Sequence, residues 1–177
     1  MTSKLKTDIL ETVSGSGTIA LTNQLSGMTS ASMPSGSVLQ VVSGTFGTNT
    51  STTSTSFVNT PVALSITPTS TSSKILIMVS APMYAANANT YAARFTIFRG
   101  TVSGVNLGDS SLGFGNQWSS TGGTSLSVTA SMSFLDSPST TSSQAYTVGI
   151  RSEGNNSAAT IMQSNAKATI TLMEIKG

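Results

Sequence analysis

The stretch that decides the fold is TSLSVTASMSFLD, residues 124–136. From Leu126 to Phe134 an apolar residue stands at every second position, and every residue between them is Ser or Thr. Because successive side chains of a strand point to opposite faces, this spacing predicts a strand with one apolar face and one hydroxyl face. Solvated strand faces ordinarily carry some Lys, Glu or Arg, so a face made only of short hydroxyls is unusual.

Short β-like runs, separated by turns rich in Gly, Asn, Ser and Pro, continue through the rest of the chain. The run KILIMVSA, residues 74–81, is apolar on both faces, which indicates a strand in the middle of a sheet. The run QAYTVGIRS alternates, with Tyr146, Val148 and Ile150 predicted to point inward. About seven or eight such runs without helical periodicity predict an all-β fold, a jelly-roll-like antiparallel β-sandwich.

The composition is that of a folded chain with very few charges. Of 177 residues, 8% are charged, against roughly 25% in ordinary soluble domains. Ser and Thr together make up about one third of the chain. A net charge of +2 without clustered Lys and Arg argues against nucleic-acid binding, and no apolar run is long enough for membrane insertion. We therefore expect neither nucleic acid nor a membrane among the partners.

Residue types that carry enzymatic chemistry are scarce. Cys and His are absent, which removes thiolate and imidazole metal ligands and the commonest general base. Asp109 and Asp136 stand in the turn-like settings LGDSS and FLDSP, where Asp accepts hydrogen bonds from backbone amides. We expect no enzymatic activity, no catalytic residue, no metal site and no cofactor.

One aromatic residue is a candidate for glycan contact. Trp118 is flanked by Asn116 and Gln117 between two glycine-rich turns. A ring beside amides suits sugar stacking, although a lone Trp also fills the end of a β-sandwich. Arg94 and Arg99, on the predicted strand ARFTIFR, either pair with acids at a subunit contact or lie on a solvated sheet face.

Residues 1–36 differ from the rest and predict an extended N-terminal arm ahead of a β-sandwich domain at 37–177. Large apolar residues are few in this arm, and SGSG at 14–17 separates its two small apolar clusters. Neither cluster can bury itself locally, so the arm is expected to dock on its own body, a sister subunit or a larger assembly. The candidate anchoring residues are Leu5, Ile9, Leu10, Ile19 and Leu21.

Several blocks of the sequence resemble small β-sandwich proteins from the virions of tailed bacteriophages, notably those of cyanobacteria. The blocks are KLKTDILETVSGSGTIALTNQLSGMTSASMPSGSVLQVV at the start, then SFVNT, ITPTSTSSKILIMV, FLDSP and ITLMEI. The resemblance spans nearly the whole chain and implies a homotrimeric capsid decoration, or cement, protein. Its arm would dock on the major capsid protein and its sandwich would project outward.

The same blocks also resemble the distal domain of tail fibres and tailspikes, which leaves a second interpretation. The chain is then a short tail fibre or receptor-binding protein that attaches to a tail protein and binds a host-surface glycan. Either protein would be made in the host cytoplasm and lie at the virion surface. The early start of the sandwich, without a shaft, favours decoration, and a free carbohydrate-binding module would leave the arm without a role.

Overall fold

The computed structural model describes residues 32–86, 91–119, 126–154 and 158–177. The chain divides into two units, Met1–Met33 and Pro34–Gly177, and every element below belongs to the second. All but the end of the predicted arm lies outside the described residues. From Gly36 onward the chain pairs with its C-terminal segment, since Gly36 N donates to Lys176 O and Lys176 N donates to Ser37 O.

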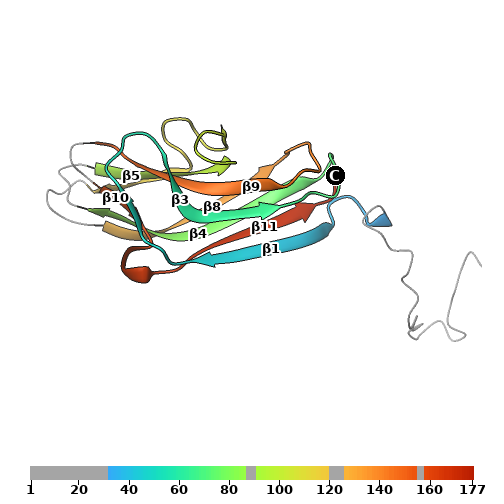
Figure 1. Cartoon of the computed structure of the whole chain (residues 1–177), viewed down its shortest axis with the longest axis horizontal. Coiled ribbons are helices and arrows are strands. Elements are labelled where there is room, and N and C mark those ends of the chain that lie inside the picture. The colour runs from blue at the N-terminus through green and yellow to red at the C-terminus, as the bar shows by residue number, and fades with distance from the viewer. Residues whose placement is uncertain (1–31, 87–90, 120–125, 155–157) are drawn as a thin grey trace, which may run out of the picture. The chain divides into compact units, whose positions relative to one another are not determined.

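The described residues form two antiparallel sheets that pack face to face (Figure 1), which confirms the predicted β-sandwich. A short 3-10 turn, η2 (Gln163–Asn165), lies between β10 and β11. The strands are β1 (Val38–Phe46), β2 (Thr50–Thr52), β3 (Val58–Ile66), β4 (Lys74–Ala86), β5 (Tyr91–Arg99), β6 (Val105–Asn106), β7 (Gly115–Ser119), β8 (Leu126–Asp136), β9 (Gln144–Ser152), β10 (Ala158–Ile161) and β11 (Ala168–Ile175).

The eight longest strands pair as a nested set. β5 pairs with β7, β4 with β8, β3 with β9 and β1 with β11, each pair antiparallel. Such nesting is one long ribbon of paired strands wound around a common core, which is the connectivity of a jelly roll. Sheet A contains β1, β11, β4 and β8, with β10 beside β4 and β2 beside β10, and sheet B contains β3, β9, β5, β6 and β7.

The core lies between the inner faces of the two sheets. β4 is central in sheet A, with β8 along one side and β11 and β10 on the other, as its two apolar faces predicted. Tyr146, Val148 and Ile150 on β9 are fully buried, which confirms their predicted inward orientation. On β8, Ala130 and Met132 are buried, but Val128 is 40% exposed, so the apolar face predicted for this strand is only partly covered.

The outer faces of the two sheets differ. A segment between β5 and β7 passes over the outer side of sheet B (Figure 1), where Val102 N donates to Asn59 Oδ1 of β3 at 2.9 Å and Arg151 of β9 donates to Ser111 O. It leaves Thr96 and Phe98, which point to that side, almost fully buried. Gly113 has a left-handed φ of 65° at this crossing, and a Cβ there would collide with the backbone of β5. Sheet A has no such cover among the described residues.

A buried ion pair joins the two sheets. Asp136 at the end of β8 accepts a hydrogen bond from Arg99 Nη2 of β5, at 2.9 Å, and lies 2.9 Å from Arg99 Nε. Tyr146 of β9 donates its hydroxyl to the same carboxylate at 2.8 Å. Burial and this hydrogen bond raise the pKa of Tyr146. The turn-capping role predicted for Asp136 is therefore wrong, because the carboxylate points into the core and meets a cation there.

A second buried carboxylate secures the loop between β3 and β4. Glu174 of β11 is fully buried and accepts hydrogen bonds from Gln40 Nε2 at 2.6 Å and from the Thr69 backbone and hydroxyl at 2.7 Å. Burial acts to raise the pKa of Glu174, but hydrogen bonds from Ser73, Gln40 and Thr69 together hold it below its usual value. Glu174 thus joins β1, β11 and the 67–73 loop through hydrogen bonds to its carboxylate.

We expect Asp136→Asn to lower the free energy of unfolding by about 3 kcal/mol, because it leaves the Arg99 guanidinium without a counter-charge. This loss of unfolding free energy is at the low end of what breaking a buried ion pair costs, because the Arg99 side chain is 26% exposed. Tyr146→Phe removes one hydrogen bond and keeps the charges, so it should cost about 1.5 kcal/mol. Urea unfolding of both variants measures the difference, and an equal loss in the two would contradict this role for the ion pair.

Candidate functional site

The residues predicted to contact partners are described only in part. The five candidate anchors Leu5, Ile9, Leu10, Ile19 and Leu21 lie outside the described residues. Trp118, Asn116 and Gln117 lie on β7, where their backbone pairs with Ala92, Arg94 and Ala93 of β5 respectively. Their side chains also fall outside what the structure describes, so the glycan contact stays a prediction.

The outer side of sheet A carries three uncharged rows of side chains, which we call the neutral face. The strand registers align one side chain each from β1, β11, β4 and β8 in every row. The first row is entirely apolar, the second has one Met among three hydroxyl side chains, and the third is all hydroxyl. In that order the rows are Val41, Met173, Leu76 and Leu135; Ser43, Thr171, Met78 and Ser133; Thr45, Thr169, Ser80 and Ser131.

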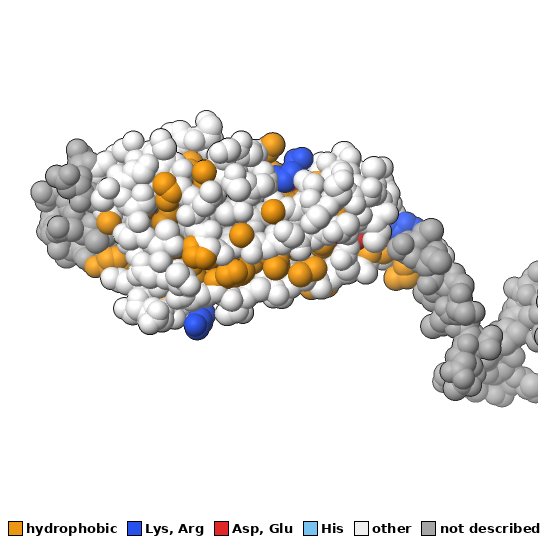
Figure 2. All heavy atoms as spheres, viewed as in Figure 1, with side chains coloured by type: hydrophobic (Ala, Val, Ile, Leu, Met, Phe, Trp, Pro, Cys, Tyr) orange, Lys and Arg blue, Asp and Glu red, His pale blue; other side chains and the backbone are white. Residues whose placement is uncertain are grey.

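The neutral face combines large exposed apolar groups with short hydroxyls. Val41 is 54% exposed, Leu135 48% and Met78 38%. Beside Met78 the small Ser and Thr side chains leave an open hollow of about 420 Å³, lined in part by Ser80, Ser131, Ser133 and Thr169. Charged side chains are also few on the side of the molecule seen in Figure 2. This surface can pack against another protein without removing any charge from water.

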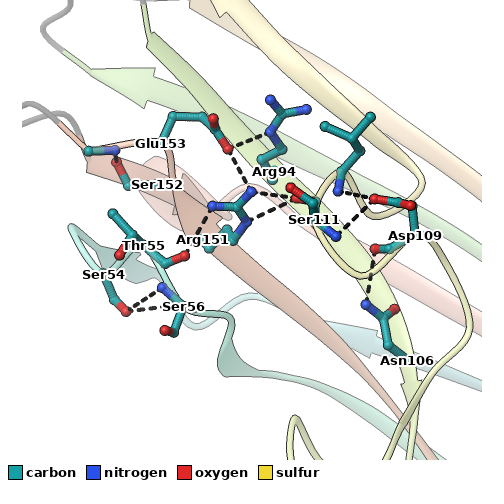
Figure 3. Close-up of polar contacts among 12 residues, drawn as sticks. Ser54, Thr55, Ser56, Arg94, Asn106, Asp109, Ser111, Arg151, Ser152 and Glu153 are labelled. Carbon is teal, nitrogen blue, oxygen red and sulfur yellow. Dashed lines mark hydrogen bonds and ion pairs between the residues drawn. The ribbon is translucent and has the colours of Figure 1, made fainter.

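A second polar feature is built around Arg151 at the end of β9 (Figure 3). Its Nε and Nη2 both donate to Ser111 O, and its Nη1 donates to Thr55 O at 3.0 Å. Nη2 also lies 2.8 Å from Glu153 Oε1, while the guanidinium carbon sits 5.5 Å from the centre of the Phe57 ring. Arg151 therefore joins the 53–57 loop, the segment over sheet B and Glu153.

The Arg151 cluster is mainly structural. Nε, Nη1 and Nη2 of the guanidinium all have protein partners, so little of its five-donor capacity is left for a ligand. Beside it lies an open hollow of about 380 Å³, lined by Thr55, Ser56, Phe57, Ser110, Ser111 and Arg151. The hydroxyls and the ring edge of this hollow can make hydrogen bonds and apolar contacts to a small polar group.

Glu153 is the common partner of two arginines. Arg94 Nε donates to Glu153 Oε1 at 2.6 Å, and Arg151 approaches the same oxygen. The Arg94 hydrogen bond, followed by the charges of Arg151 and Arg94, lowers the pKa of Glu153 against the effect of burial. Arg94 and Arg99 both pair with acids of their own chain, which corrects the two environments predicted for them, a subunit contact and a solvated face.

Asp109 has the role that its sequence setting predicted. Its Oδ1 accepts hydrogen bonds from Ser111 N at 2.8 Å and from Leu112 N at 2.6 Å, within the segment that covers sheet B. These two backbone hydrogen bonds lower the pKa of Asp109. The carboxylate shapes a turn, and the four acids on the described strands and loops all accept hydrogen bonds from the protein itself.

Groupings that would hold a metal ion are not found in the described part of the chain. Within those ranges no three Asp, Glu, His or Cys side chains come together. The described residues also contain no helix with the length and apolar character that a membrane crossing requires. Comparison with protein-family models and with curated proteins finds no match for this chain. The neutral face and the hollow beside Arg151 are therefore the two candidate sites on the described residues.

Acid should weaken the fold through the carboxylates with lowered pKa, namely Glu153, Glu174 and Asp109. A carboxylate with a lower pKa in the folded state contributes stability above its unfolded-state value of about 4, and this is lost as the pH falls through the folded value. We expect the urea midpoint to fall below about pH 4.5.

Glu153→Gln provides the test of this acid response. The variant lacks one of the three carboxylates, so its midpoint should change less steeply with pH between about 5 and 3 than that of the unsubstituted chain. Identical slopes in the two proteins would show that the Arg94–Glu153–Arg151 cluster contributes nothing to the acid response. Val105→Ala, at an exposed position without a charge, serves as the control.

Proposed function

We propose that this chain is a non-enzymatic structural protein of a tailed-phage virion, a homotrimeric capsid decoration protein. Its arm, residues 1–36, docks on the major capsid protein, and its β-sandwich projects outward. The observation that carries the proposal is the neutral face of sheet A, read together with the sequence blocks that resemble phage decoration proteins. The protein is expected to act by covering and bracing a surface, without chemistry.

The neutral face supports this role because of its physical properties. Short Ser and Thr side chains lose little conformational entropy when they are ordered at a contact. A face without charges has no ion pairs to be screened, so its contacts depend little on ionic strength. Exposed Val41, Met78 and Leu135 add apolar area to such contacts. A coat surface that meets wide changes of salt and dilution benefits from all three properties.

The jelly roll is compatible with the proposal but does not select it. Jelly rolls form viral capsid domains and also lectin domains, so the fold alone supports either interpretation by analogy. The tail-fibre alternative gains one observation, the hollow beside Phe57 and Ser111, whose hydroxyls and ring suit a glycan. Against it, most of the hydrogen-bonding capacity of Arg151 is already used within the chain.

Copy number in purified particles separates the two functions. Quantitative mass spectrometry against the major capsid protein should give hundreds of copies in a simple ratio if the chain decorates the capsid. A few copies to a few tens would instead assign it to the tail. Light scattering of the purified protein tests the trimer separately, and a monomer at micromolar concentration would contradict it.

Virion attachment should depend on the apolar residues of the arm. Replacing Leu5, Ile9, Leu10, Ile19 and Leu21 by Ser removes the groups expected to be buried on the capsid, so binding to particles that lack this protein should be lost. The matched control replaces Thr18 and Thr22 by Ala and should bind normally. Unfolding curves verify that both variants keep the sandwich, and full binding by the Ser variant would refute the anchor.

A further inference from the structure

The edges of the two sheets are unequally protected against pairing with other chains. β2, β6 and β7 are short, with three, two and five residues. β3 contains Pro61 and a break in register between Asn59 and Ala63, and β1 has a shift between Val38 and Gln40. Short strands, proline and bulges are the features by which natural sheets prevent edge-to-edge association.

β8 has none of these features. Its eleven residues pair with β4 in one unbroken register from Leu126 to Asp136, and among the described strands β4 is its sole partner. The strand contains no proline, and its single charge, Asp136, is turned inward to Arg99. A long, regular, uncharged edge strand is a template for pairing with a further strand.

The inner side of the β8 edge is also incompletely covered. Val128 points to the same side as buried Ala130 and Met132, yet it is 40% exposed. Phe134, on that side too, is only partly buried and packs edge-on against Phe114, with 5.7 Å between the ring centres. A strand added beside β8 would cover apolar groups that the single chain leaves in contact with water.

We propose that β8 pairs antiparallel with β8 of a second copy of this chain, about a two-fold axis at Ser131. The strand is complementary to itself in this register. Ala130 then faces Met132 of the partner and Val128 faces Phe134, so a smaller side chain meets a larger one at these two inward positions. Thr129 faces Ser133 on the outer side, and the neutral face continues without a charge into the second copy.

The contact joins the A sheets of two copies into one sheet. Cross-strand hydrogen bonds supply most of its affinity, as in other strand additions. It is isologous and two-fold, so it differs from the three-fold contact of the proposed trimer and can link two trimers side by side. It does not rest on the proposed function, since loss of β8 pairing would leave capsid decoration untouched.

A cysteine placed on the axis gives a direct test, because the chain has no cysteine of its own. In Ser131→Cys the two thiols face each other across an antiparallel pair about 4.5–5.5 Å wide between Cα atoms, which is within disulfide range. Mild oxidation of the full chain should give a covalent dimer. Ser127→Cys on the same strand, which would face Leu135, and Ser65→Cys on exposed β3 should remain uncrosslinked.

Charged pairs test the register without a covalent bond. Thr129→Lys with Ser133→Lys places like charges opposite each other and should abolish the two-fold contact in sedimentation velocity. Thr129→Lys with Ser133→Glu places opposite charges in the same positions and should restore it. Equal crosslinking at positions 131 and 65, or identical sedimentation of the two charged variants, would overturn the proposal. Crosslinking that appears only after removal of residues 1–31 would overturn it too, by assigning the edge to the arm.

Discussion

The packing of the inner faces of sheets A and B against each other is the constraint from which the rest of the structure follows. This packing requires apolar residues at most inward-facing positions of β4, β9, β11 and β8. The alternate positions face outward and need not be apolar. On sheet B those positions are largely covered by the segment between β5 and β7. On sheet A the outer positions stay open and, apart from Lys74 at the start of β4, they hold hydroxyl and apolar groups without charge. The outer sides of the two sheets therefore differ.

The few charges of the chain are placed where they connect separate parts of the fold. Asp136 joins the two sheets through Arg99, Glu174 holds the 67–73 loop, and Glu153 gathers two arginines beside the segment over sheet B. Because these carboxylates are met by hydrogen-bond donors, the cost of removing them from water is offset locally. None of these paired acids and arginines lies in the three rows of the neutral face.

Local patterns predicted the strands well but not the contacts between them. The two apolar faces of residues 74–81 placed β4 in the middle of a sheet, and the alternation of β9 predicted its buried residues. The turn chemistry of FLDSP predicts a capping role for Asp136, whereas its partners Arg99 and Tyr146 come from strands that only the tertiary fold brings near. The Arg151 cluster was missed for the same reason. The scarcity of charge is the one sequence signal for ion pairs, and it applies to Asp136 and Glu153, which meet arginines of their own chain and not of a sister subunit.

The nested pairing of strands also dictates the order in which the fold can be assembled. Of the eight principal strands, the innermost pair, β5 with β7, is the first that a growing chain can complete, and β1 with β11 is the last. The apolar strand β4 has no partner until β8 has been synthesised some forty residues later. A newly made chain therefore carries its most hydrophobic segment unpaired for much of its synthesis. Folding is also slowed because the paired strands are far apart in the sequence. Sheet A can be completed only once β11, the last of the described strands, has been synthesised and has taken its place between β1 and β4.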